Sequence, residues 1–194
     1  MKPILPNMGV WLNEVATLGT ENDQFSFARI DRDEKVAIEN DLRHQPQGIR
    51  TYGGHIGVCA NGRPDFTVVK LDKMGIAKAV YTRSLSCGDA IRFDRENTRH
   101  GELQLLCVVS KNANVFTPTS RQDIDTMAAQ LEKELGVPAT SQLISCTGVI
   151  GVPLPMDIVA NAIDGVAVKL QPCALEQAAE AILTTDKKAK MASV

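Results

Sequence analysis

The chain has 194 residues, of which 44% are hydrophobic and 23% charged, and its formal net charge is −2. This size and composition are typical of one soluble globular domain or of one lobe of a larger unit. Acidic and basic residues are mixed along the chain, which argues against a nucleic-acid surface, and no apolar run approaches the roughly 18 residues of a membrane helix. Because the first residues lack the apolar core of a signal peptide, we expect a cytoplasmic protein.

The cysteines and histidines predict neither disulfides nor a metal site. An odd number of cysteines without a CxxC pair favours reduced thiols. The three histidines lie far apart in the sequence, so no Cys/His cluster with metal-ligand spacing is present. These residues are Cys59, Cys87, Cys107, Cys146 and Cys173, together with His44, His55 and His100.

Residues 1–45 form an N-terminal extension that precedes the main domain, which we place at residues 46–194. Phe25, Phe27 and Ile30 alternate with polar residues and predict a strand with one apolar face. The charged segment 31–44 predicts a solvated helix. This extension is interpreted as an accessory edge element or oligomer contact, with a regulatory arm or lid over a site as the alternative.

Strands dominate the next part of the chain. A glycine-rich strand at 52–59, the turn signal Asn61-Gly62 and a returning strand at 65–71 predict a hairpin. A third strand is predicted at 76–82. The nearly continuous apolar run at 103–110 predicts a fourth strand that is buried on both faces.

Helices follow in the second half of the chain. Apolar residues at helical spacing predict a helix over 122–135, which Gly136 ends. A strand at 142–145 comes next, and shorter helices are predicted at 156–163 and 175–183. The order of strands and helices predicts an α/β fold of layered sheets and helices.

The segment from Cys146 to Asp157 is the most informative of the sequence. It reads C-T-G-V-I-G-V-P-L-P-M-D, a turn of small residues closed by two prolines. Gly148 and Gly151 carry no Cβ, so another molecule can approach the backbone closely. The backbone N–H groups and the Thr147 hydroxyl are suitable donors for an oxyanion.

This segment resembles the motif S-T-G-V-I-G-x-P-L-P-M-D of the ornithine acetyltransferase (glutamate N-acetyltransferase) family of arginine biosynthesis. Residues 178–186, A-A-E-A-I-L-T-T-D, are similar to the family's A-A-x-A-I-M-T-T-D, and 190–193 to its P-K-x-A-S with Ala189 in place of proline. Residues 80–83 and 111–115 are weaker matches, to V-F-T-x-N and G-N-A-N-A. The resemblance covers about residues 46–194 and implies the N-terminal (α) lobe of the self-processing ornithine-acetyltransferase fold.

The resemblance also implies roles for individual residues. Thr147 and Gly148 match the pair that forms the oxyanion hole, and Thr184, with Thr185 beside it, matches a substrate contact. The alternative for each is structural: a glycine-containing turn, and threonines that end a helix. Three residues are possible members of the site lining. They are Asn112 and Asn114, for which a structural loop is the simpler interpretation, and Cys146, which replaces the family's serine.

The implied reaction is ping-pong transfer of acetyl from N-acetylornithine to glutamate, without a metal or organic cofactor, although some members use acetyl-CoA as donor. The family's nucleophile is the first threonine of a β chain released by autocatalytic cleavage, and that motif is absent here. We therefore expect an incomplete enzyme that needs a β chain, acts on small amino acids and assembles as an αβ heterotetramer.

Two other hypotheses remain. The first is a non-catalytic module that binds a small molecule or a partner on the same scaffold. The second is a cysteine-dependent acyltransferase with Cys146 as its nucleophile.

Overall fold

A computed structural model describes residues 45–186 and 188–191, and the compact unit discussed below runs from Gln45 to Ala189. The strand and helix predicted within residues 1–45 lie outside the described residues. The elements follow in the order β1 (Ile49–Gly54), β2 (Phe66–Ile76), α2 (Asp89–Asn97), β3 (Glu102–Asn112), α3 (Ser120–Leu135), β4 (Gln142–Val149), α4 (Met156–Ile163), β5 (Gln171–Pro172) and α5 (Leu175–Ala181).

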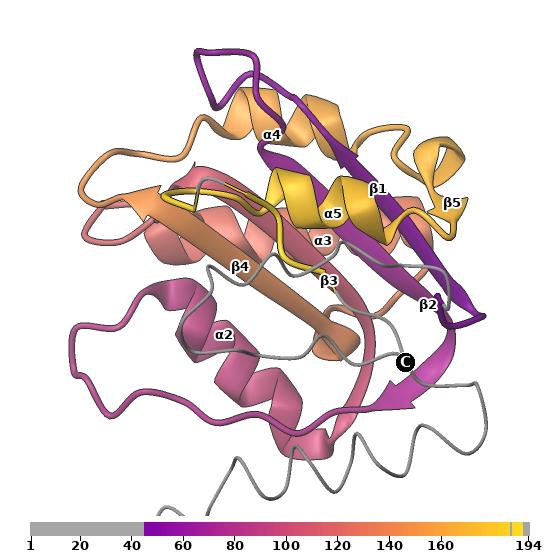
Figure 1. Ribbon diagram of the computed structural model, residues 1–194. Coiled ribbons are helices and arrows are strands. Elements are labelled where there is room, and N and C mark those ends of the chain that lie inside the picture. Colours follow the sequence, from indigo (N-terminus) through magenta and orange to yellow (C-terminus); the bar gives the residue numbers. More distant parts are fainter. Residues whose placement is uncertain (1–44, 187, 192–194) are drawn as a thin grey trace, which may run out of the picture. The chain divides into compact units, whose positions relative to one another are not determined.

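The strands form one sheet in the order β4-β3-β2-β1-β5 (Figure 1). Antiparallel pairs join β1 to β2, β2 to β3 and β1 to β5, whereas β3 and β4 are parallel. The crossover between β3 and β4 contains α3, as a parallel connection requires. Within the described residues β4 is an edge strand, which leaves alternate backbone groups along its outer side without a strand partner.

Helices cover both faces of the sheet (Figure 1). On one face, α2, α3 and α4 enclose an apolar core whose largest members include Phe66, Leu105, Ile124, Leu131 and Ile144. On the other face, α5 packs against β1 and β2. It lies so close to β1 that a Cβ added to Gly53 would come within 2.2 Å of the Gln177 carbonyl oxygen, so only glycine fits there.

Most predicted elements are confirmed. The hairpin forms, although its first strand ends at Gly54 and residues 55–65 make a long loop. Asp65 holds this loop, because its buried carboxylate accepts the backbone N–H groups of Ile56 at 2.7 Å and Cys59 at 2.6 Å. The fourth strand is buried as expected, and α4 has the predicted bounds. The helix predicted at 175–183 ends two residues earlier, at Ala181.

Three expectations at the level of elements were wrong. No strand forms at 77–82, where Val80 is 99% exposed and β2 has already ended. A helix, α2, occupies residues for which none was predicted. Finally, Cys146 to Val149 do not belong to a turn: they continue β4, and the turn begins at Ile150. The α/β fold class itself is confirmed by this sheet and its helices.

Candidate functional site

Most of the residues predicted to form a site gather at the carboxyl ends of β3 and β4. Because these strands are parallel, their last residues and the loops that follow lie at the same edge of the sheet. Ser110 lies beside Thr147, Lys111 beside Gly148 and Asn112 beside Val149.

Gly148 is required by its surroundings. Its φ of +143° is one that residues with a side chain rarely adopt, and an added Cβ would lie 2.1 Å from the Lys111 carbonyl carbon. Thr147 and Gly148 are both exposed, on a strand whose outer edge is open in the described part of the chain. This position leaves both residues accessible to another molecule.

The end of α5 is bonded to the end of β3. The Ser110 hydroxyl donates to the Ala181 carbonyl oxygen at 2.7 Å, and the Lys111 ammonium donates to the Leu183 carbonyl oxygen at 2.5 Å. A longer contact of 3.4 Å joins Lys111 Nζ to the carbonyl oxygen of Thr184. These bonds bring the segment of Thr184, which is half-buried, to the strand end that carries Thr147.

Cys146 lies on the opposite face of β4 from Thr147. Side chains alternate along a strand, and the partly buried Cys146 packs against the apolar core. Burial, together with the negative charges of Asp94 and Asp123, raises the pKa of the Cys146 thiol to about 12. Since the thiolate is the nucleophilic form, this environment disfavours the cysteine-dependent mechanism.

Asn112 and Asn114 are buried and bonded to the loops after β3 and β4. The Asn112 amide donates to the carbonyl oxygens of Val152 at 3.1 Å and Pro153 at 3.2 Å. Its carbonyl oxygen accepts the backbone N–H of Asn114 at 2.7 Å, and the Asn114 amide donates to the carbonyl oxygen of Ser120 at 3.0 Å. Both side chains therefore shape the loops beside Thr147.

Two polar residues beside β4 were not predicted. Lys111 lies within a weak motif match, and a lysine at the position of the family's glycine is a signal that the sequence carries. Asp94 belongs to the unpredicted helix α2, and its buried carboxylate accepts the Ile144 backbone N–H at 2.9 Å. Burial raises the pKa of Asp94 to about 7, because desolvation outweighs that hydrogen bond.

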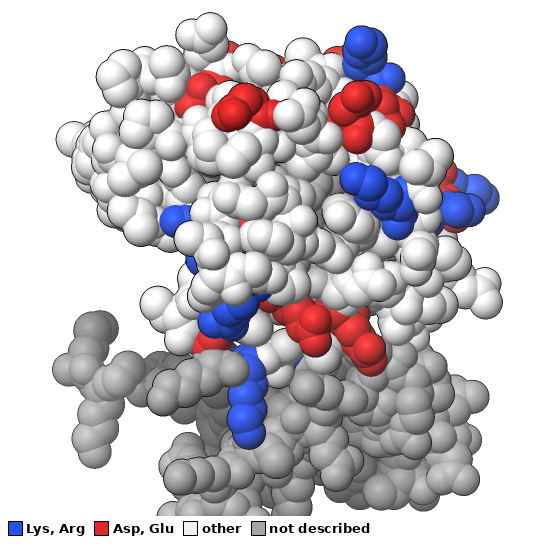
Figure 2. Space-filling view, turned by 90° about the horizontal axis from the view of Figure 1, so that it is seen from above, with Lys and Arg blue, Asp and Glu red and all other residues white. Residues whose placement is uncertain are grey.

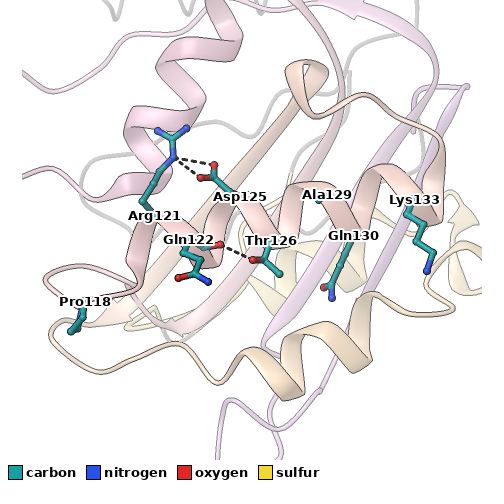
Figure 3. A pocket seen from close by; sticks show the side chains of 8 residues that line it. All are labelled: Pro118, Arg121, Gln122, Asp125, Thr126, Ala129, Gln130 and Lys133. Atoms are coloured by element: carbon teal, nitrogen blue, oxygen red, sulfur yellow. Dashed lines mark hydrogen bonds and ion pairs between the residues drawn. The ribbon is translucent and has the colours of Figure 1, made fainter.

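A separate hollow of about 820 Å³ lies on the outer side of α3 (Figure 3). Figure 3 shows an ion pair between Arg121 and Asp125 and a hydrogen bond from Thr126 to the Gln122 carbonyl oxygen, within one helix face. Nearly all of its lining comes from this single helix, and none of the predicted site residues belongs to it. This hollow is therefore separate from the candidate site at the strand ends.

The face of the molecule seen in Figure 2 carries both kinds of charge. Acidic and basic side chains are interspersed among uncharged ones on the face seen in Figure 2. Among the described residues no cluster of His, Cys, Asp or Glu could hold a metal ion. No helix in that part of the chain is long and apolar enough to cross a membrane.

Comparison with known proteins agrees with this geometry. Residues 50–194 match the ArgJ family. The chain belongs to this family. The arginine biosynthesis bifunctional protein ArgJ of Rhodococcoides fascians is 30% identical over 147 residues, which are 75% of this chain and 36% of the relative. Glutamate N-acetyltransferase Oat2 of Streptomyces clavuligerus is 30% identical over 146 residues, 75% of this chain and 37% of the relative.

A solved relative has the same fold. The ornithine acetyltransferase of Mycobacterium tuberculosis, crystallised in complex with ornithine, superimposes with a TM-score of 0.69 at 26% identity. The match covers 74% of this chain and 79% of the solved chain. The present chain thus spans little more than a third of these curated relatives, but most of that crystallised chain.

Proposed function

We propose that this chain is the α portion of an acetyltransferase that moves an acetyl group from N-acetylornithine, or a related donor, to glutamate or another amine. One observation carries the proposal: an exposed Thr147-Gly148 pair on an edge strand shares its end of the sheet with the segment of Thr184. Thr147 and Gly148 would supply the oxyanion donors. Thr184, with Thr185 beside it, would contact the substrate.

The chemistry follows from where charge develops. Attack on an acetyl carbonyl places a negative charge on its oxygen, and donors fixed in advance stabilise that charge without reorganisation. One such donor is worth about 3–4 kcal/mol of the barrier in a water-excluded site. Gly148 suits this role because the absence of a Cβ leaves the backbone open to the acetyl oxygen.

A second chain would complete the site. Phe116, Ile150 and Val152 on the two loops beside Thr147, and Val149 at the end of β4, expose between 48% and 71% of their area. These loops are joined by a 2.8 Å hydrogen bond from the Gly151 N–H to the Val115 carbonyl oxygen. A β chain covering this apolar surface would also exclude water from the oxyanion donors.

The lengths of the relatives support a two-part enzyme. The aligned residues cover 79% of the crystallised ornithine acetyltransferase chain but only 36% of the ArgJ protein of Rhodococcoides fascians. We infer a β chain that begins with a threonine nucleophile, arises by autocatalytic cleavage and joins the α chain in a heterotetramer. The reaction would be ping-pong, in the cytoplasm, without a metal or organic cofactor, with acetyl-CoA as an alternative donor.

Native mass spectrometry and an acetyl-transfer assay on the protein produced from its complete coding region test this function. The proposal predicts a second chain that begins with threonine, in stoichiometric amount, and transfer from N-acetylornithine to glutamate. A complex of that kind without transfer from N-acetylornithine or acetyl-CoA to any amine would contradict the assigned reaction. A lone 21.0 kDa species that binds an amino acid without turnover would favour the binding module.

A further inference from the structure

Lys111 has a backbone conformation that is unfavourable for lysine. Its φ is +80°, in the left-handed region that glycine tolerates and other residues rarely adopt. The motif that residues 111–115 resemble begins with glycine at this position. Such a conformation persists in a non-glycine residue only where the surrounding structure holds it.

The left-handed conformation changes where the side chain goes. In a regular strand, Ser110 and Lys111 would point to opposite faces of the sheet. Here both donate to the chain segment that ends α5, Ser110 to the Ala181 carbonyl oxygen at 2.7 Å and Lys111 to that of Leu183 at 2.5 Å. The interruption at Lys111 therefore places two consecutive side chains on the same segment.

The charge of Lys111 suits this target. The carbonyl groups of Leu183 and Thr184 lie just beyond the end of α5, and a hydrogen bond from a charged donor to such a group is stronger than one from a neutral donor. The Lys111 ammonium meets both of them, since Nζ also lies 3.4 Å from the Thr184 carbonyl oxygen. The lysine is partly buried, so these bonds are less screened by water than bonds on an open surface.

We propose that Lys111 is a positioning residue that fixes the Leu183–Thr184 backbone against the end of β3. It thereby holds the Thr184 side chain at a set distance from Thr147 and Gly148. This inference rests on the proposed acyl-transfer function for its catalytic consequence. The bond between Lys111 and the segment after α5 can be tested without that function.

Three substitutions separate the effect of the Lys111 charge from the effect of its backbone conformation. Lys111→Met removes the charge and keeps a side chain of similar length at positive φ. Lys111→Gly removes the charge and relieves the backbone. Lys111→Arg keeps the charge. Lys133→Met, on the outer face of α3, is the matched control.

Hydrogen exchange of the amides of residues 182–186, measured on the whole chain and on its complex with any β chain, is the first readout. We expect exchange about tenfold faster in Lys111→Met and Lys111→Gly, with partial recovery in Lys111→Arg and no change in Lys133→Met. Exchange in β3 and α3 should stay at the level of the unmodified protein. Unchanged exchange at 182–186 in Lys111→Met would overturn the proposal.

Kinetics of the complete enzyme give the second readout. A displaced substrate contact should raise KM for the amino-acid substrate about tenfold, with a smaller change in kcat. Faster exchange with unaltered kinetics would overturn the positioning role. If the unmodified assembly transfers no acetyl group while Lys111→Met still speeds exchange, the proposed function fails and the bond from Lys111 to the end of α5 stands.

Discussion

The two faces of the sheet are built from different chemistry. Under α2, α3 and α4, fully buried apolar side chains such as Phe66, Val109 and Ile144 pack together. Under α5, the buried side chains include Thr51, Thr67 and Ser110, and glycine allows close approach of the helix. The apolar face supplies stability through burial. On the other face, Ser110 and Lys111 fix the end of α5 through directed hydrogen bonds, whereas the buried hydroxyls of Thr51 and Thr67 have no hydrogen-bond partner among the described residues. We therefore expect substitutions on the first face to change stability, and those at the polar strand ends to change activity.

The largest effect is expected on the apolar face. Ile144 is fully buried, so Ile144→Ala removes its transfer free energy and leaves a cavity. The expected loss in the free energy of unfolding is about 2–5 kcal/mol, measured by urea denaturation. A loss below about 0.5 kcal/mol would contradict the contrast between the two faces, because the apolar face under α2, α3 and α4 would then not supply the stability.

Gly148→Ala tests the strand end. The added Cβ would lie 2.1 Å from the Lys111 backbone, and the backbone φ of +143° at this position is itself unfavourable for alanine. Gly151 is the matched control, because its φ is +78° but nothing lies within 4 Å of an added Cβ. We expect Gly148→Ala to cost about 1–3 kcal/mol and to displace the end of β4, and Gly151→Ala to cost about 1 kcal/mol from φ alone. Equal losses in the two variants would show that the contact with Lys111 does not constrain Gly148.

Asp94 is a polar exception on the apolar face and should make stability depend on pH. Its folded-state pKa of about 7 lies above the ordinary 3.8, so the folded protein binds this proton more tightly than the unfolded chain. The resulting stability is present below about pH 4 and is lost as the pH rises to about 7. Its size is on the order of 4 kcal/mol, because the pKa rises by about 3 and each pKa unit is worth about 1.4 kcal/mol.

Asp94→Asn isolates this contribution, because the amide oxygen can still accept the Ile144 N–H. As the pH rises from 5 to 8, the free energy of unfolding of the unmodified protein should fall relative to that of Asp94→Asn. Burial also raises the pKa of Asp123, which adds a slope of the same sign to both proteins and cancels in the difference. A constant difference over that range would contradict the assignment.

Sequence patterns predicted elements whose buried faces are apolar and regular. In α3, Ile124, Met127 and Leu131 repeat at helical spacing, and Gly136 ends the helix in a left-handed conformation. The helix α2 was missed because Asp94 and Asn97 form half of its buried face. Its other buried residues, Ala90 and Phe93, are too few to give a clear period.

The strand predicted at 76–82 does not continue beyond Ile76, and the reason is tertiary. Its residues have strand-like composition, but β3 pairs with β2 only as far as Ile76. Strand propensity reflects packing on a sheet, and without a partner the segment stays irregular.

The site could be predicted in part. Thr147, Gly148 and Thr184 came from motif resemblance, and their roles stay predictions. That Ser110 and Lys111 would bond to the end of α5 could not be read from the sequence, because those bonds join residues about 70 positions apart. Asn112 matches the asparagine of the family motif, but its hydrogen bonds to Val152 and Pro153 depend on loops that only the fold brings together.

The most direct test of the contrast between the two faces is the activity and stability of Thr147→Val in the completed enzyme. The substitution keeps the shape of the exposed threonine and removes its hydroxyl. The control is Thr140→Val, at another exposed threonine, two residues before β4 begins. We predict acetyl transfer about 10²–10³-fold slower in kcat, with unfolding free energy within about 0.5 kcal/mol of the unmodified protein. Unchanged transfer would contradict the oxyanion role of Thr147. A large loss of stability would contradict the expectation that substitutions at the polar strand ends change activity and leave stability unchanged.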